Sequence, residues 1–285
     1  MTQWFEGAGG IRLAATCYGP EEGAPVVLIG GLGQIRHSWK RAADLLAIGG
    51  RRAITLDLRG HGESGWSPDG VYDYPRLVED LVAVVRQLGR PAALVGASLG
   101  GKVALATAGY GGQDVACALA MVDTAPRTRP SGVREVIGPM QDRSGFASPD
   151  AAAEAVARNR GRDPEPGAGE KLRRNLRVDA EGRWHWHWDP VLMDRDHGLG
   201  MLPALEYLEL AAARLEIPVL LGRGEMSPVT SDEGVDAFKA LVPQTVVEII
   251  PGARHMIVGD ENDVFAAGLI RFLDTVPQLR TLAPM

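Results

Sequence analysis

A serine between glycines is the feature of this sequence best suited to covalent chemistry. The stretch Val95–Gly101 reads Val-Gly-Ala-Ser-Leu-Gly-Gly and contains Gly-x-Ser-x-Gly centred on Ser98. A serine hydroxyl is a weak nucleophile near neutral pH, so it needs a base beside it, and histidine commonly fills that role. Of the six histidines, His255 lies nearest the C-terminus, in the segment Pro251–Met256. Ser98 and His255 are the first candidates for acyl transfer.

The elements around Ser98 are those that such a nucleophile needs. Ala92–Ala97 is an apolar run that predicts a buried strand, and Leu99–Ala108 is a stretch of small residues that predicts a helix. A tight turn between them requires small flanking residues, which the glycines supply. Ser98 is then held at the N-terminus of a helix, where unpaired N–H groups favour negative charge.

The acid that would orient His255 has two candidates. Asp123 directly follows the apolar run Val115–Val122, and Glu225 follows the apolar run Ile217–Leu221. In a parallel sheet both strand ends lie on the same side as Ser98, so position alone does not separate them. We expect Asp123, because a carboxylate at a strand end can be held dry and hydrogen-bonded, and we keep Glu225 as the alternative acid. Asp123 could instead serve only as a turn or helix-capping residue.

Strands and helices alternate through most of the chain. Alternation of this kind predicts an α/β fold with a mostly parallel central sheet and helices on both faces. The other predicted strands are Ile11–Tyr18, Pro25–Ile29, Arg52–Leu56 and Thr245–Ile250; the other predicted helices are His37–Ala47, Tyr74–Leu88, Ser231–Leu241 and Asn262–Leu273.

The alternation stops in the middle of the chain. Residues 126–215 contain Pro- and Gly-rich joints between helical stretches such as Asp150–Asn159. We interpret this segment as an inserted helical lid or cap over the strand ends. Residues 1–125 and 216–285 then form one core domain.

Two further segments resemble a known family. Leu28–Gln34 resembles the oxyanion loop of α/β-hydrolase fold serine hydrolases, and Asp57–Ser64 resembles their Asp-x-Arg-Gly-x-Gly-x-Ser turn. With the Ser98 turn, the chain looks like an esterase-like member with a helical cap over nearly its whole length. The resemblance implies an oxyanion hole built from the backbone amides of Leu32 and Leu99.

The sequence departs from the family pattern at one position, and one histidine of the family turn is expected to have no catalytic role. Members commonly carry His-Gly before the oxyanion residue, whereas this chain has Gly30 and Gly31. The missing imidazole removes a bracing hydrogen bond of the loop and no reacting group. His61 in the second turn is expected to be structural.

Aromatic residues in the lid and one loop histidine are candidate substrate contacts. Trp186 and Trp188 alternate with histidines and predict an aromatic wall, although packing within the lid explains them equally well. His37 borders the oxyanion loop. His185 and His187 have no third ligand at suitable spacing, so we expect no metal.

The predicted activity is that of a carboxylesterase-like enzyme (EC 3.1.1) acting on small to medium esters or lactones, without a cofactor. A C–C bond hydrolase or a cofactor-free perhydrolase could use the same three residues. A non-catalytic receptor for a small ligand is the alternative from another class.

Charge, hydropathy and cysteine content indicate which kinds of partner and which cellular location to expect. The net charge of −6 and the lack of a basic cluster argue against nucleic-acid binding. No apolar run approaches the ~20 residues that span a membrane, and no signal peptide is apparent. The two cysteines, Cys17 and Cys117, suit a reducing compartment. We therefore expect a cytoplasmic protein, as a monomer or a homodimer.

Overall fold

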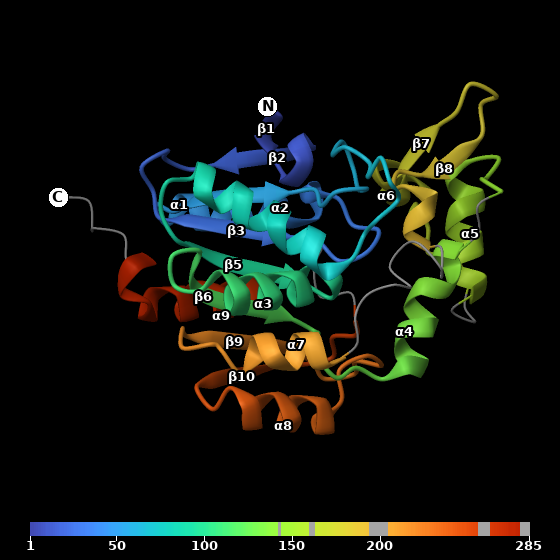
Figure 1. Cartoon of the computed structure of the whole chain (residues 1–285). Coiled ribbons are helices and arrows are strands. Elements are labelled where there is room, and N and C mark those ends of the chain that lie inside the picture. Colours follow the sequence, from blue (N-terminus) through green and yellow to red (C-terminus); the bar gives the residue numbers. More distant parts are fainter. Residues whose placement is uncertain (142–143, 160–162, 194–204, 256–262, 280–285) are drawn as a thin grey trace.

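An eight-stranded mixed sheet runs through the molecule (Figure 1). The computed structural model describes residues 1–141, 144–159, 163–193, 205–255 and 263–279. The spatial order of the strands is β1-β2-β4-β3-β5-β6-β9-β10. Their bounds are β1 Gln3–Glu6, β2 Arg12–Tyr18, β3 Pro25–Ile29, β4 Arg52–Leu56, β5 Ala92–Ala97, β6 Ala116–Val122, β9 Val219–Gly224 and β10 Thr245–Ile250.

Most of the sheet is parallel. Strand β2 pairs antiparallel with β1 and with β4, and every pairing from β4 to β10 is parallel. Strands β5 and β6 are buried at every residue, as expected for parallel strands covered on both faces. The predicted fold class is therefore confirmed. The short first strand Gln3–Glu6 was not predicted, because four residues carry too little pattern.

Helices cover both faces of the sheet, as Figure 1 shows. Apolar side chains of α2, α3, α7 and α8 join one core cluster, and those of α1 and α9 join the other. In the described part of the chain, no helix is both long and apolar enough to cross a membrane. The bounds are α1 Lys40–Ile48, α2 Tyr74–Gln87, α3 Leu99–Gly111, α7 Leu205–Ala212, α8 Asp232–Leu241 and α9 Asp263–Thr275.

A second group of elements lies on the side toward which the parallel strands point (Figure 1). It contains the helices α4 Pro130–Ile137, α5 Pro149–Asn159 and α6 Ala168–Leu172 and the strands β7 Leu176–Val178 and β8 Trp184–Trp186. The two strands form an antiparallel pair, which sequence analysis did not predict. Apolar side chains of α5, α6, β7 and β8 join a small cluster, to which Tyr72 also belongs.

Helix α7 belongs to the main core although it falls within the predicted lid segment 126–215. Its Leu208, Ala211 and Ala212 are buried in the cluster that covers the sheet. Gly109 of α3 lies so close to Ala211 that a Cβ atom there would be 2.8 Å from the Ala211 Cα. The helix therefore packs on α3, and the exact division of the chain into core and lid stays a prediction.

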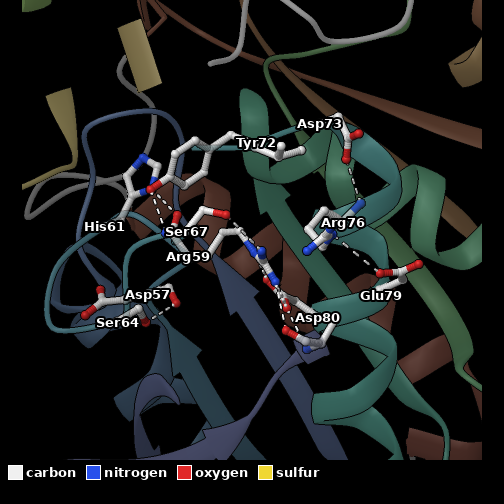
Figure 2. A network of polar contacts seen from close by, with 12 residues as sticks. Asp57, Arg59, His61, Ser64, Ser67, Tyr72, Asp73, Arg76, Glu79 and Asp80 are labelled. Carbon is white, nitrogen blue, oxygen red and sulfur yellow. Dashed lines mark hydrogen bonds and ion pairs between the residues drawn. The ribbon is translucent and has the colours of Figure 1, made fainter. Parts of the chain in front are cut away.

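The Asp57–Ser64 turn is held by buried polar contacts (Figure 2). Arg59 forms a two-pronged ion pair with Asp80 of α2, with its Nε and Nη2 atoms each 2.6 Å from a carboxylate oxygen. Asp80 also accepts a hydrogen bond from the Ala8 amide at 2.8 Å. Both charged side chains are almost fully buried, so neither charge could be solvated if its partner were lost.

The Asp80→Ala substitution should lower the free energy of unfolding by about 3–5 kcal/mol, because it leaves the Arg59 guanidinium buried and unpaired. Denaturant unfolding followed by circular dichroism measures the change. Glu79→Ala is the matched control, since Glu79 is exposed on the same helix and should change stability by less than about 0.5 kcal/mol. Equal effects of the two substitutions would contradict a supporting role for the Arg59–Asp80 pair.

Candidate active site

Ser98 lies in a sharp turn between β5 and α3. Its backbone has φ 48° and ψ −115°, a conformation that residues other than glycine rarely adopt. The turn closes because Gly96 and Gly100 have no side chains: a Cβ on Gly96 would lie 2.5 Å from the Gly101 nitrogen, and one on Gly100 would lie 2.6 Å from the Ile29 oxygen. The predicted strand–turn–helix is therefore present at Ser98.

Ser98, His255 and Asp123 form a chain of hydrogen bonds. His255 Nε2 is 3.2 Å from Ser98 Oγ, and His255 Nδ1 is 2.7 Å from Asp123 Oδ2. A carboxylate only accepts, so the proton of the neutral imidazole lies on Nδ1. Nε2 then presents its lone pair to the Ser98 hydroxyl, which is the arrangement a general base requires.

Asp123 is the first residue after β6 and is buried. Its side chain is 2% exposed and that of His255 is 8% exposed. The Gly224 amide donates to Asp123 Oδ1 at 3.2 Å, and the Ser227 hydroxyl donates to Oδ2 at 2.7 Å. The carboxylate thus receives donors from the β9 end, the following loop and His255.

Glu225, the alternative acid, has a different environment. Its side chain accepts a hydrogen bond from the Gly252 amide at 2.8 Å, and its own amide donates to the Ile250 carbonyl at 3.0 Å. These contacts brace the turn that leads from β10 to His255. The structure brings Asp123, and not Glu225, to His255 Nδ1.

The loop after β3 passes directly beside the nucleophile. A Cβ on Gly31 would lie 3.2 Å from the Ser98 Cβ, which is tighter than most Cβ contacts, so a side chain there would press on Ser98. The Gly31 amide donates to Gln34 Oε1 at 2.7 Å, and the Gln34 amide donates to the Gly31 carbonyl at 3.0 Å. Gln34 therefore braces this loop from within, a role that sequence analysis missed.

Of the two predicted oxyanion donors, Leu99 directly follows Ser98, and Leu32 directly follows Gly31, which lies close to Ser98. Leu99 is the first residue of α3, so its amide has no carbonyl partner inside the helix. Within the described ranges, the Leu32 amide donates to no backbone or side-chain acceptor. Within the described part of the chain both amides thus lack a hydrogen-bond acceptor, and their role as oxyanion donors stays a prediction.

The predicted substrate contacts lie in unlike surroundings. Trp186 and Trp188 are buried and stack on each other, with ring centroids 4.8 Å apart. Trp188 also packs on the oxyanion loop, because a Cβ on Gly33 would lie 2.8 Å from its ring. His37 is exposed, in a short 3₁₀ turn before α1. Contact of these three side chains with a substrate stays a prediction.

Two buried histidines join the second group of elements to the core. The Gly62 amide donates to His187 Nδ1 at 2.6 Å, and His61 Nδ1 donates to the Arg59 carbonyl at 3.1 Å. The ring centroids of the two histidines are 6.1 Å apart. Burial lowers the pKa of both: that of His187 falls to about 3, with further contributions from His61 and Arg177, and that of His61 falls as well. Both are therefore neutral at pH 7.

This geometry suits covalent catalysis by an activated serine, because nucleophile, base and carboxylate are joined in series next to free amides. In the described residues, no three His, Cys, Asp or Glu side chains gather as metal ligands. His185 instead lies against Asp179, with its Nε2 2.6 Å from a carboxylate oxygen.

The fold and the site define a class, and sequence comparison agrees with it. A profile of the alpha/beta hydrolase family matches residues 26–268. The chain belongs to the alpha/beta hydrolase family.

Individual proteins that resemble this chain share a limited part of its sequence or a low identity with it. Esterase Rv0045c of Mycobacterium tuberculosis is 38% identical over 103 residues, which cover 35% of this chain and 33% of the esterase. The matched stretch thus spans only about a third of that relative's length. The sn-1-specific diacylglycerol lipase ABHD11 of Xenopus laevis is 28% identical over 260 residues, covering 89% of this chain and 80% of the lipase. Among solved structures, E-2-(acetamidomethylene)succinate hydrolase superposes with a TM-score of 0.80 at 22% identity, over 96% of this chain and 99% of the other.

Acidification should destabilise the protein through His187. Its pKa is about 3 when folded and 6.5 in the ordinary state, so the unfolded chain binds more protons between these values. The stabilisation is complete above pH 6.5 and decreases as the pH falls, by about 2 kcal/mol at pH 5. Denaturant unfolding at several pH values measures this loss.

His187→Asn keeps an acceptor for the Gly62 amide and removes the titrating group. Its stability should therefore vary less between pH 6.5 and pH 5 than that of the wild type, with His61 supplying part of the remaining dependence. Ser148→Ala is the control: it removes a hydrogen bond at the start of α5 and no titrating group, so it should keep the wild-type decrease. An unchanged decrease in His187→Asn would refute the assignment.

Proposed function

We propose that the chain is a carboxylesterase-like serine hydrolase that cleaves small to medium carboxylic esters or lactones through an acyl-enzyme on Ser98. The observation that carries this proposal is the hydrogen-bond series from Ser98 Oγ through His255 to Asp123. Ser98 is the nucleophile, His255 the general base and Asp123 the orienting acid. Leu32 and Leu99 supply the oxyanion amides.

In the first half of the reaction, Ser98 Oγ attacks the ester carbonyl carbon and its proton passes to His255 Nε2. The carbonyl oxygen becomes an oxyanion held by the two amides. The carbon–oxygen bond to the leaving group then breaks, and the leaving oxygen takes the proton from Nε2. Asp123 stabilises the transient imidazolium through its contact with Nδ1 and stays ionised.

In the second half, water replaces the leaving group. His255 Nε2 accepts a proton from the water, whose oxygen attacks the acyl carbon bound to Ser98. The tetrahedral intermediate uses the same amides, and its collapse returns the proton to Ser98 Oγ. The products are a carboxylic acid and the free serine.

The similarity to an esterase and to a diacylglycerol lipase supports an ester as the substrate. The stacked Trp186 and Trp188 support an apolar acyl or alcohol group, since Trp188 packs on Gly33, next to the proposed donor Leu32. A lactone presents the same carbonyl and leaving oxygen, joined in one ring.

Ser98→Ala should lower kcat/KM for p-nitrophenyl butyrate by at least ~10⁴-fold, because no other group can form the acyl-enzyme. It should also abolish labelling by a fluorophosphonate probe. Ser148→Ala is the control; Ser148 caps α5, where it accepts from the Ala151 amide, and its loss should leave labelling intact. Wild-type protein that is folded but never labelled would favour a ligand-binding receptor instead.

Asp123→Asn should lower kcat by about 10³–10⁴-fold, because an amide facing His255 Nδ1 favours the wrong tautomer. Glu225→Gln should keep kcat within about threefold, since a glutamine can still accept the hydrogen bond from Gly252. Esterase assays of both variants at saturating substrate measure the difference. The opposite ranking would transfer the acid role to Glu225.

A further inference from the structure

Ser227 lies in the loop between β9 and α8 and is buried. Its hydroxyl oxygen accepts hydrogen bonds from the Val229 amide at 3.1 Å and the Thr230 amide at 3.0 Å. A serine hydroxyl has two lone pairs and one proton. Since both lone pairs are occupied by amides, the proton has a fixed direction, toward Asp123 Oδ2 at 2.7 Å.

The same carboxylate oxygen faces His255. Asp123 Oδ2 is 2.7 Å from Ser227 Oγ and 2.7 Å from His255 Nδ1. Among the described residues, the other oxygen receives only the Gly224 amide, at the longer distance of 3.2 Å. Ser227 is therefore the only side chain in the described part of the molecule that shares the oxygen on which the orientation of His255 depends.

We propose that Ser227 is a positioning residue of the active site, which sets the direction and the basicity of Asp123 Oδ2 for His255. This inference rests on the proposed function. Among the described hydrogen bonds, Ser227 pairs with neither Ser98 nor His255, so it acts through the Asp123 carboxylate. Ser227 lies in the same loop as Glu225, the alternative acid, and contributes a hydroxyl to Asp123, which follows β6.

Two effects follow from the geometry. A donated hydrogen bond draws charge from Oδ2, so its removal makes the carboxylate attract the His255 proton more strongly. The acidic limb of the rate profile should then move to higher pH, because His255 becomes harder to deprotonate. Loss of the donor also frees the carboxylate to rotate, which should lower kcat while leaving KM nearly unchanged.

The test measures kcat and KM for p-nitrophenyl butyrate from pH 5 to 9 in the wild type and three variants. Ser227→Ala should lower kcat about 10–100-fold, the range expected for a hydrogen bond to a charged group. It should change KM by less than about twofold and move the acidic limb upward by about 0.5 pH unit. Ser227→Thr keeps the hydroxyl and should recover most of the rate.

Ser231→Ala is the matched control for loop stability. Ser231 is also a buried serine of this loop, and its hydroxyl accepts from the Gly234 amide at 3.1 Å at the start of α8. Its loss should lower the melting temperature without moving the pH profile. If Ser227→Ala does not fold, Ser227→Cys provides the test, since a thiol keeps the volume and donates only weakly.

The outcomes separate this proposal from the proposed function. An inactive, unlabelled wild type would overturn the function itself. An active wild type with a folded Ser227→Ala or Ser227→Cys variant of unchanged kcat and pH profile would overturn the role of Ser227 alone. A Ser227→Thr variant as slow as Ser227→Ala, with the same pH profile as the wild type, would show that only loop packing matters and would also overturn it.

Discussion

The arrangement of this site depends on the register of two neighbouring parallel strands. Ala97 at the end of β5 pairs with Val122 at the end of β6, so Ser98 and Asp123 are the next residues on adjacent strands. Their amides continue the ladder: Ser98 donates to the Val122 carbonyl at 3.0 Å, and Asp123 to the Gly222 carbonyl at 2.7 Å. Both then turn with φ 48°, and among the described residues they are the only ones other than glycine with positive φ. A shift of register would separate the proposed nucleophile Ser98 from the proposed acid Asp123, and His255 could no longer hydrogen-bond to both.

Such backbone conformations cost on the order of 1–3 kcal/mol each and persist only where the surroundings hold them. The backbone conformation of Ser98 is stabilised by close packing, since Gly100 lies against Ile29 and Gly31 lies against Ser98. The backbone conformation of Asp123 is stabilised by hydrogen bonds, because Gly224 and Ser227 both donate to its carboxylate. The strained residues and the contacts that hold them thus lie together at the ends of three neighbouring strands, β5, β6 and β9. We expect this packing to preorganise the proposed catalytic groups before substrate binds.

Sequence patterns predicted the strands around this unit well, because buried parallel strands leave long apolar runs such as Ala92–Ala97. The turn at Ser98 was predictable because its steric demand appears directly as glycines. The choice between Asp123 and Glu225 was less certain, since it depends on side-chain directions that no spacing encodes. Ser227 and Gln34 were missed for the same reason: each acts through one hydrogen bond to a partner positioned by the fold. The packing of α7 on α3 was not predicted, because the small residues that pack on Gly109 carry no distinctive pattern.

The second group of elements contacts the two loops that frame the nucleophile. The Asp189 amide donates to the Gly60 carbonyl at 2.8 Å, and the Tyr72 hydroxyl donates to the Asp189 carboxylate at 2.5 Å. Asn175 donates to the Gly33 carbonyl at 3.0 Å, one residue from the amide proposed to hold the oxyanion. These contacts connect the region to the residue next to Leu32, the proposed oxyanion donor. Because loss of one oxyanion donor costs about 10²–10³ in rate, we expect substitutions that break these contacts to lower the rate of the chemical step.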